Sequence, residues 1–300
     1  MKLFQTVVFT CLLAFTALAH CNTASFESKD GQTEQTPKQI ISGTWYEMKS
    51  AIMSEIRRYA VHLPPSYFDN PEKSYPVLYV LDGYATRIRG VGGMIEALSY
   101  YDLGQQIPEF IVVAIPNTNR TRDLIPTQND LIFKGKVFDK LADNSGGADV
   151  FAKFMRKELF PTIESKFRTT KLRGILGMSF GGIFAAHILL KHPQMFSHYL
   201  ICDATFVWDD NYLNRTLTKS YQALLDKKIS VFVGLANNDH LGELGITNRQ
   251  WGNDFIASLK AIDNEELVVT SRYFPKEQHG TVMFLAFYHG LIDLFKNTEK

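Results

Sequence analysis

Short apolar runs recur along the chain and have the lengths of buried strands. Most are continuous stretches of apolar and β-branched residues, as expected for strands covered on both faces. The run over 57–64 alternates instead and ends at Pro64-Pro65. The pattern predicts strands over residues 57–64, 75–83, 109–117, 172–177, 198–203, 229–237 and 266–274.

Longer runs with helical spacing lie between several of these strands. Within 148–167, apolar residues recur at helical intervals, and Pro161 predicts a kink because proline cannot donate the backbone hydrogen bond. Strands that alternate with helices favour an α/β fold, a mainly parallel twisted sheet with helices on both faces. The other helices are predicted over residues 179–191, 248–261 and 281–296.

The N-terminal region has a different pattern. Lys2, an apolar run over 7–19 and the small residues at its end have the layout of a signal peptide cleaved near Ala19, and the run is short for a membrane span of roughly 20 residues. The sequence therefore predicts a signal peptide (1–19), a flexible polar lead-in (20–40) and one domain (41–300). Export to the periplasm or medium follows, with no stable membrane insertion after cleavage. A lipoprotein anchored at Cys21 is the alternative.

Charge and cysteine content narrow the class of partner. The 32 basic and 31 acidic residues nearly cancel, so no general field attracts nucleic acid or an anionic membrane. After signal cleavage Cys21 and Cys202 remain, one in a polar tail and one in an apolar strand, and two unpaired thiols are expected. The sequence lacks HExxH and regularly spaced Cys/His ligands, so neither a metal nor an organic cofactor is implied.

Ser179 stands in "LGMSFGG", where a predicted buried strand turns directly into a helix. In a nucleophile elbow this turn is tight, and we expect Gly177 and Gly181 to remove Cβ atoms that would collide with neighbouring elements. The serine hydroxyl would then stand above the sheet edge, at a helix N-terminus that favours negative charge. The alternative is that Ser179 is only a helix N-cap between packing glycines.

A nucleophilic serine needs a base, and the order Ser, acid, His along the chain selects among the histidines. His279 lies between the last strand and the last helix, with Gly280 beside it. The acid is expected after the strand over 229–237, where Asp239 is the first choice and Glu243 the second. A surface His279, a turn-forming Asp239 and a Ser–His dyad without an acid stay open.

These stretches resemble the putative-esterase family of α/β hydrolases, and most closely its siderophore (enterochelin-type) esterase branch. The resemblance rests on "YPVLYVLDGY", "NTNRTRDLIPT", "GILGMSFGGIFA" and "KEQHGTVMF" and covers about residues 50–290. It implies Ser179 as nucleophile and His279 as base, with some members working as a dyad. The backbone N–H groups of Tyr84 and Phe180 match the oxyanion hole, as the elbow also predicts. Arg120 matches an arginine proposed to face substrate oxygens; its alternative is an ion pair with Asp123 or another loop carboxylate.

The predicted function is an exported serine esterase that hydrolyses a small-molecule carboxylic ester through an acyl-enzyme. An acyltransferase with the same residues and a non-catalytic binding protein are the alternatives. The segment between Cys202 and Ile229, with Trp208 and Tyr212, and the loop over 128–147 are expected to wall an open cleft suited to a siderophore or another bulky or aromatic acyl group. No oligomeric state is predicted.

Overall fold

A computed structural model of the chain describes residues 40–100, 104–296 and 298. Residues from Ile41 to Lys300 form one compact unit. The predicted signal peptide, Cys21 and nearly all of the predicted lead-in lie outside the described residues. No helix within the described ranges is long and apolar enough to cross a membrane.

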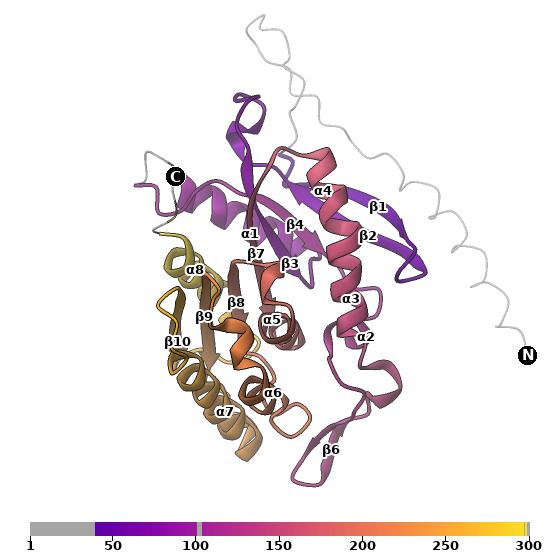
Figure 1. Cartoon of the computed structure of the whole chain (residues 1–300), viewed down its shortest axis with the longest axis vertical. Helices are drawn as coiled ribbons and strands as arrows, with labels where there is room; N and C mark the ends of the chain where they lie inside the picture. The colour runs from indigo at the N-terminus through magenta and orange to yellow at the C-terminus, as the bar shows by residue number, and fades with distance from the viewer. Residues whose placement is uncertain (1–39, 101–103, 297, 299–300) are drawn as a thin grey trace, which may run out of the picture. The chain divides into compact units, whose positions relative to one another are not determined.

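An eight-stranded sheet in the order β1-β2-β4-β3-β7-β8-β9-β10 forms the centre of this unit (Figure 1). The six strands from β4 to β10 in that order are parallel, and β1 and β2 add antiparallel pairs at one edge. All carboxyl ends of the parallel strands therefore meet at one edge of the sheet. The strands are β1 (Thr44–Ser50), β2 (Glu55–His62), β3 (Tyr75–Leu81), β4 (Ile111–Ile115), β7 (Thr169–Met178), β8 (His198–Cys202), β9 (Ile229–Ala236) and β10 (Leu267–Phe274).

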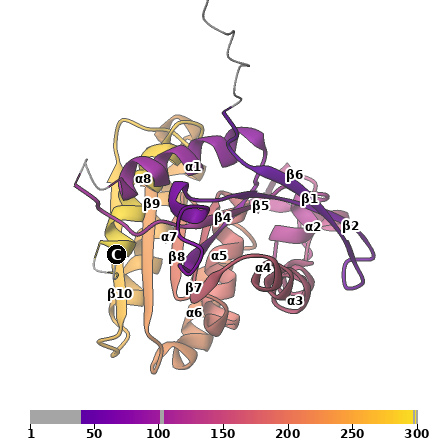
Figure 2. The same cartoon turned by 90° about the horizontal axis from the view of Figure 1, so that it is seen from above.

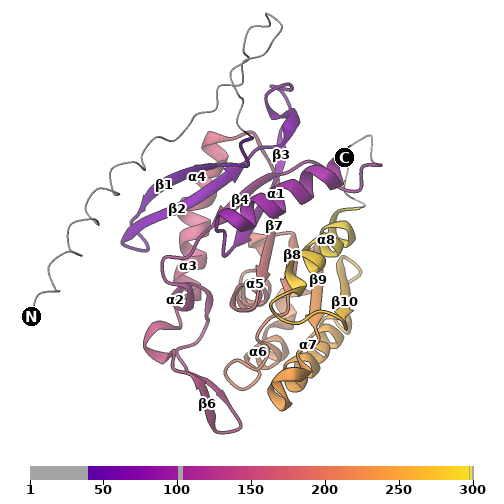
Figure 3. The same ribbon diagram turned by 180° about the vertical axis from the view of Figure 1, so that it is seen from behind.

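Helices cover both faces of the sheet. On one face α1 and α8 pack together, and α3 to α6 lie on the other (Figures 2 and 3). Successive residues of β3 divide between the two cores: Val77 and Tyr79 join one, and Leu78 and Val80 the other. The helices are α1 (Ala85–Ser99), α2 (Arg120–Leu124), α3 (Ala148–Phe154), α4 (Phe160–Lys166), α5 (Phe180–Lys191), α6 (Tyr212–Ser220), α7 (Glu243–Lys260) and α8 (Val282–Phe295).

The helix expected over 148–167, with a kink at Pro161, is instead interrupted by a π-helical segment just before this proline. α3 passes into a π-helical segment over Met155–Leu159, and α4 continues from there. Proline has no N–H to donate to a carbonyl of the preceding turn, so the hydrogen-bond ladder cannot run through it unchanged. The wider π turn is a common way for a helix to absorb such a break.

The segment over 128–147 contains a two-stranded hairpin, β5 (Leu131–Phe133) and β6 (Lys136–Asp139). This hairpin extends beyond the main sheet (Figure 1). Ile132, Val137 and Phe138 are exposed on it. At its tip, Lys134 forms an ion pair with Glu243 at the start of α7. The hairpin is therefore tied to a segment that follows the carboxyl end of β9.

Candidate active site

Three neighbouring parallel strands end on residues with unusual backbone angles. Asp82 follows β3, Ser179 follows β7 and Asp203 follows β8, with φ values of 51°, 59° and 40°. Residues other than glycine rarely adopt positive φ, and such strain collects at functional sites. Because β3, β7 and β8 are adjacent in the sheet, the three residues lie along the same edge.

The turn at Ser179 has the geometry of a nucleophile elbow. Ser179 has φ 59° and ψ −119°, and its N–H donates to the carbonyl of Cys202 at 3.0 Å. A Cβ on Gly177 would lie 2.0 Å from the carbonyl oxygen of Gly181, so that position requires glycine. The Ser179 side chain makes no capping hydrogen bond to α5. Ser179 therefore occupies the N-cap position of α5, but its hydroxyl is not used as a capping group.

Gly181 differs from its predicted role. A Cβ there would lie 3.4 Å from its nearest neighbours, which include Asp82 Oδ2, and this is ordinary van der Waals contact. The collision expected at Gly181 is absent, and of the two glycines only Gly177 is sterically required.

His279 is held by a carboxylate that the sequence reasoning missed. Its Nδ1 lies 2.6 Å from Oδ2 of Asp203, which is 1% exposed. Asp203 also accepts hydrogen bonds from the N–H of Ala236 at 3.0 Å and from the side-chain amide of Asn238 at 2.9 Å. The Asn238 oxygen accepts the backbone N–H of His279 at 2.8 Å. The loop and the imidazole are thus both fixed, and Nε2 has no hydrogen-bond partner among the described residues.

The structure contradicts the prediction that Asp239 or Glu243 orients His279. Asp239 accepts a hydrogen bond from Arg249 at 2.5 Å on the surface, and Glu243 pairs with Lys134. Asp203 is nearer because β8 lies between β7 and β9, which places the residue after β8 between the ends of its neighbours. The strand predicted over 198–203 ends in this aspartate, and an acidic residue at a strand end was the sequence feature that could have indicated it.

The two expected oxyanion donors differ in their present bonding. The N–H of Phe180 is the first amide of α5 and has no hydrogen-bond partner among the described residues. A helix N-terminus carries partial positive charge, so this amide suits a developing anion. The N–H of Tyr84 donates to the carbonyl of Asp82 at 2.9 Å, which closes a three-residue turn. Only the Phe180 amide is therefore unoccupied.

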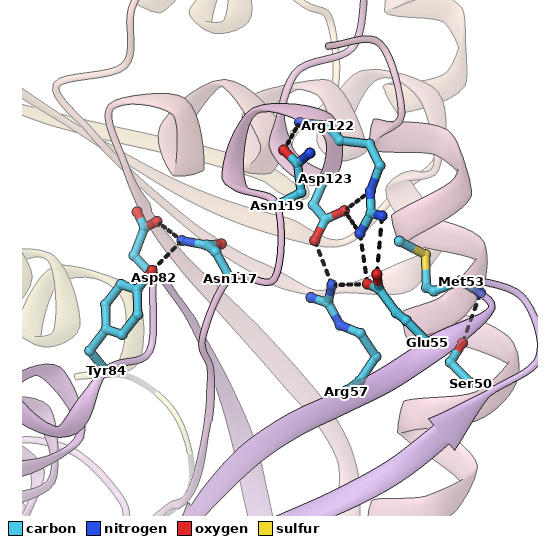
Figure 4. A network of polar contacts seen from close by, with 10 residues as sticks. All are labelled: Ser50, Met53, Glu55, Arg57, Asp82, Tyr84, Asn117, Asn119, Arg122 and Asp123. Atoms are coloured by element: carbon cyan, nitrogen blue, oxygen red, sulfur yellow. Dashed lines mark hydrogen bonds and ion pairs between the residues drawn. The ribbon is translucent and has the colours of Figure 1, made fainter. Parts of the chain in front are cut away.

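Arg120 lies beside this turn in an ion pair. It donates from Nε to Oδ1 of Asp82 at 2.6 Å and from Nη2 to Oδ2 at 3.0 Å. Its guanidinium carbon lies 5.0 Å from the ring centroid of Phe180. Arg120 therefore forms the ion pair that was the alternative to substrate binding, and its partner is Asp82 and not Asp123. Figure 4 shows Asp123 turned instead towards Arg57 and Arg122, and Asn117 reaching Asp82.

The aromatic residues expected to line a cleft are largely internal. Trp208 is 1% exposed, packs against Phe180 with ring centroids 6.0 Å apart, and donates its indole N–H to Thr127 at 2.8 Å. The Tyr212 hydroxyl lies 2.8 Å from Nδ1 of His187. Trp208 is thus part of the core beneath the site, and the hairpin β5–β6 carries the exposed apolar residues nearby. Within the described residues no group of three or more His, Cys, Asp or Glu side chains could hold a metal ion.

The mostly parallel sheet, the helices on both faces and the elbow at Ser179 define an α/β-hydrolase fold. A family model described as "Putative esterase" matches residues 50–243. The chain belongs to this family.

Individual relatives agree with the family. The chain is 29% identical over 185 residues to the ferri-bacillibactin esterase BesA of Bacillus subtilis, covering 58% of this chain but only 62% of that protein. It is 23% identical over 234 residues to the apo-salmochelin esterase of Escherichia coli O6:H1, covering 75% and 70%. The crystal structure of an IroE-like serine hydrolase from Shewanella oneidensis matches with a TM-score of 0.78 and 30% identity, covering 86% of this chain and 81% of that one.

Proposed function

We propose that this protein is a serine esterase that cleaves carboxylic esters through an acyl-enzyme. One observation carries the proposal: the imidazole of His279 is held at Nδ1 by buried Asp203, 2.6 Å away, while its Nε2 is left without a partner among the described residues. A general base needs this arrangement, because a carboxylate at one nitrogen fixes the tautomer that accepts a proton at the other. The strained turn at Ser179, on the strand next to Asp203, supports the assignment.

In the proposed reaction Ser179 Oγ attacks the ester carbonyl and gives its proton to Nε2 of His279. Asp203 keeps Nδ1–H oriented and stabilises the imidazolium that forms. Collapse of the tetrahedral intermediate breaks the ester bond, and His279 returns the proton to the leaving alcohol. Water then attacks the acyl-enzyme and gives its proton to Nε2 of His279. Collapse of the second tetrahedral intermediate releases the acid, and His279 returns the proton to Ser179 Oγ. Transfer of the acyl group to an added alcohol instead of water would identify an acyltransferase.

The negative oxygen of the intermediate needs donors that are already in place. The free N–H of Phe180, at the N-terminus of α5, is the first. We assign the second to the N–H of Tyr84, in keeping with the family resemblance. That amide donates to the carbonyl of Asp82 at 2.9 Å in a three-residue turn. An oxyanion would compete with the Asp82 carbonyl for it.

The proposed substrate is a small siderophore ester with bulky aromatic acyl groups. Two relatives are named as esterases of the siderophores bacillibactin and salmochelin. The hairpin β5–β6 supports this class, since Phe138 is exposed there and Lys136 lies 5.0 Å from its ring centroid. Aromatic and cationic groups together suit an aromatic anion. Export is part of the proposal, and it rests on the signal-peptide pattern over residues 1–19.

The first experiment separates the serine mechanism from the substrate. Wild-type protein should be labelled by a fluorophosphonate probe, and Ser179→Ala should abolish labelling. Ser165→Ala is the matched control, because Ser165 lies exposed on α4 and bonds only the carbonyl of Thr162; it should label normally. Equal labelling of wild type and Ser179→Ala would overturn the mechanism.

The second experiment is a panel of esters from short p-nitrophenyl esters to a catecholate trilactone. A higher kcat/KM for the trilactone is expected. Preference for short linear esters at every concentration would overturn the siderophore assignment and leave the esterase standing.

A further inference from the structure

Asp82 is a buried carboxylate beside the site that the proposed reaction does not use. It is 3% exposed and has a φ of 51° at the end of β3. Both of its oxygens are occupied: Oδ1 accepts from Arg120 at 2.6 Å and from Asn117 at 2.5 Å, and Oδ2 accepts from Arg120 at 3.0 Å and from Arg87 at 3.3 Å. A strained backbone and a full set of donors at one residue indicate a position that is fixed for a purpose.

The contact with Arg120 uses one side of its guanidinium. Nε and Nη2 both bond Asp82, so the plane of the group is fixed by two parallel hydrogen bonds. Nη1 has no hydrogen-bond partner among the described residues, and the side chain is 36% exposed. The same group lies over the ring of Phe180, whose backbone amide adjoins Ser179. Nη1 is therefore the nitrogen of Arg120 that is left free to donate, in a guanidinium that lies beside Phe180.

The helix that carries Arg120 is anchored separately on its other side. α2 is short, and Asn119 caps it by accepting the N–H of Arg122 at 3.0 Å. Arg122 and the buried Arg57 both bind Asp123 (Figure 4). These contacts hold the backbone of α2, while Asp82 holds the side chain of Arg120.

The charges around Asp82 keep it ionised. Burial raises its pKa, but the hydrogen bond from Arg120, the charges of Arg120 and Arg87 and the hydrogen bond from Asn117 outweigh burial, so the net effect lowers the pKa. Arg87 also donates to the carbonyl of Leu81 at 3.0 Å. Asp82 therefore has two cations, and only Arg120 faces the residue next to the proposed nucleophile.

The family resemblance already places Arg120 against substrate oxygens. We propose that Asp82 is the positioning residue for this contact, because it orients the Arg120 side chain so that Nη1 can donate to an oxygen of the bound ester. This inference rests on the proposed function. It narrows the substrate to esters that carry a further acceptor, such as a carbonyl, phenolate or carboxylate oxygen, near the scissile bond. Arg120 would contact this oxygen directly, and Asp82 would act through Arg120.

The test is a double-mutant cycle of Asp82→Asn and Arg120→Met, read as kcat/KM per folded molecule. Misplacing a substrate-positioning group costs up to about 100-fold in rate, so each single variant should lose about 10- to 100-fold. The double variant should be no worse than Arg120→Met alone, because Asp82 has nothing left to orient. Arg120→Lys should also lose most activity, since an ammonium cannot make the two-point contact.

The matched control is the exposed pair Arg58 and Glu47, 2.7 Å apart on β2 and β1. Arg58→Met and Glu47→Gln make the same chemical changes away from the site and should leave kcat/KM unchanged.

Independent, multiplying losses from Asp82→Asn and Arg120→Met would overturn the inference alone. Full activity of Arg120→Lys would also overturn it, and that variant decides the matter if Asp82→Asn fails to fold. If the wild type hydrolyses no ester in the panel, the proposed function is overturned and the inference falls with it.

Discussion

Asp82 and Asp203 are two buried aspartates on the same sheet edge, yet one is held by charged donors and the other by neutral backbone and amide donors. Asp203 binds neutral groups, an N–H and an amide, in addition to His279. Asp82 binds two arginines. The negative charge of Asp82 is balanced by the two arginines. The carboxylate of Asp203 is oriented by neutral donors and has no arginine or lysine beside it among the described residues. Only the second arrangement can stabilise a cation that forms transiently, such as an imidazolium.

The contrast also separates what each residue does for the fold. A buried carboxylate held by neutral donors is oriented but keeps its negative charge, so it can still stabilise a neighbouring positive charge such as an imidazolium. A buried ion pair has its attraction offset by desolvation, and its main effect appears when one partner is removed. We therefore expect changes at Asp203 to alter chemistry most, and changes at Asp82 to alter stability together with the placement of Arg120.

The largest expected effect is that of Asp203→Asn on catalysis. The amide would favour the wrong imidazole tautomer and leave the imidazolium unsupported, and such a change costs about 10⁴-fold in kcat in the serine protease template. We expect a fall of about 10³- to 10⁴-fold in kcat, measured by steady-state ester hydrolysis. Asp239→Asn is the control and should stay within about twofold, because Asp239 pairs with Arg249 on the surface. Similar losses in both variants would remove the distinction.

The next effect is that of Asp82→Asn on stability. The substitution leaves Arg87 and Arg120 without their carboxylate, and breaking a buried pair costs about 3–5 kcal/mol. Because Arg120 is partly exposed and can be solvated, we expect a loss of roughly 2–4 kcal/mol in the free energy of unfolding. Urea unfolding measures it, with the exposed Glu47→Gln as the control that should change little. An unchanged unfolding free energy would show that Asp82 is not held as a buried ion pair.

The smallest expected effect is the pH dependence of stability that Asp82 contributes. Its pKa in the folded protein lies below the ordinary value of 3.8. The contribution is therefore complete above that value and is lost as the pH falls through the lower, folded pKa. As the pH is lowered from about 5 to about 3, the unfolding free energy of the wild type should decline more steeply than that of Asp82→Asn. Parallel curves would contradict this assignment.

Most of the fold followed from the sequence because the buried strands are continuous apolar runs. All seven predicted strands and the predicted helices occur, with shifts at their ends. The strand β1, the hairpin β5–β6 and the helices α1, α2 and α6 were not predicted. In α1, Gly90, Gly92 and Gly93 lower the intrinsic helix propensity. A Cβ on Gly90 would lie 2.4 Å from Phe284 on α8. Close packing of two distant helices thus explains a local pattern that disfavours helix.

The site was predictable only where chain order and strand ends were enough. Ser179 and His279 follow from the elbow pattern and from the order of elements, and the structure places both at the carboxyl edge of the sheet. Asp203 did not follow, because it depends on which strands are neighbours in the sheet. Chain order favoured the loop after β9, and sheet order favours β8. The positive φ of Asp203 and the inward turn of Asn238 cannot be read from residue types.

Among the described residues, Asp203 is the carboxylate that holds the imidazole of His279. The most direct measurement is a proton NMR spectrum of the far-downfield region, where the ring N–H of a strongly hydrogen-bonded histidine resonates. We predict a strongly downfield Nδ1–H resonance in the wild type and in Asp239→Asn, and its loss in Asp203→Asn and His279→Gln. A resonance that survives in Asp203→Asn but disappears in Asp239→Asn would contradict the account.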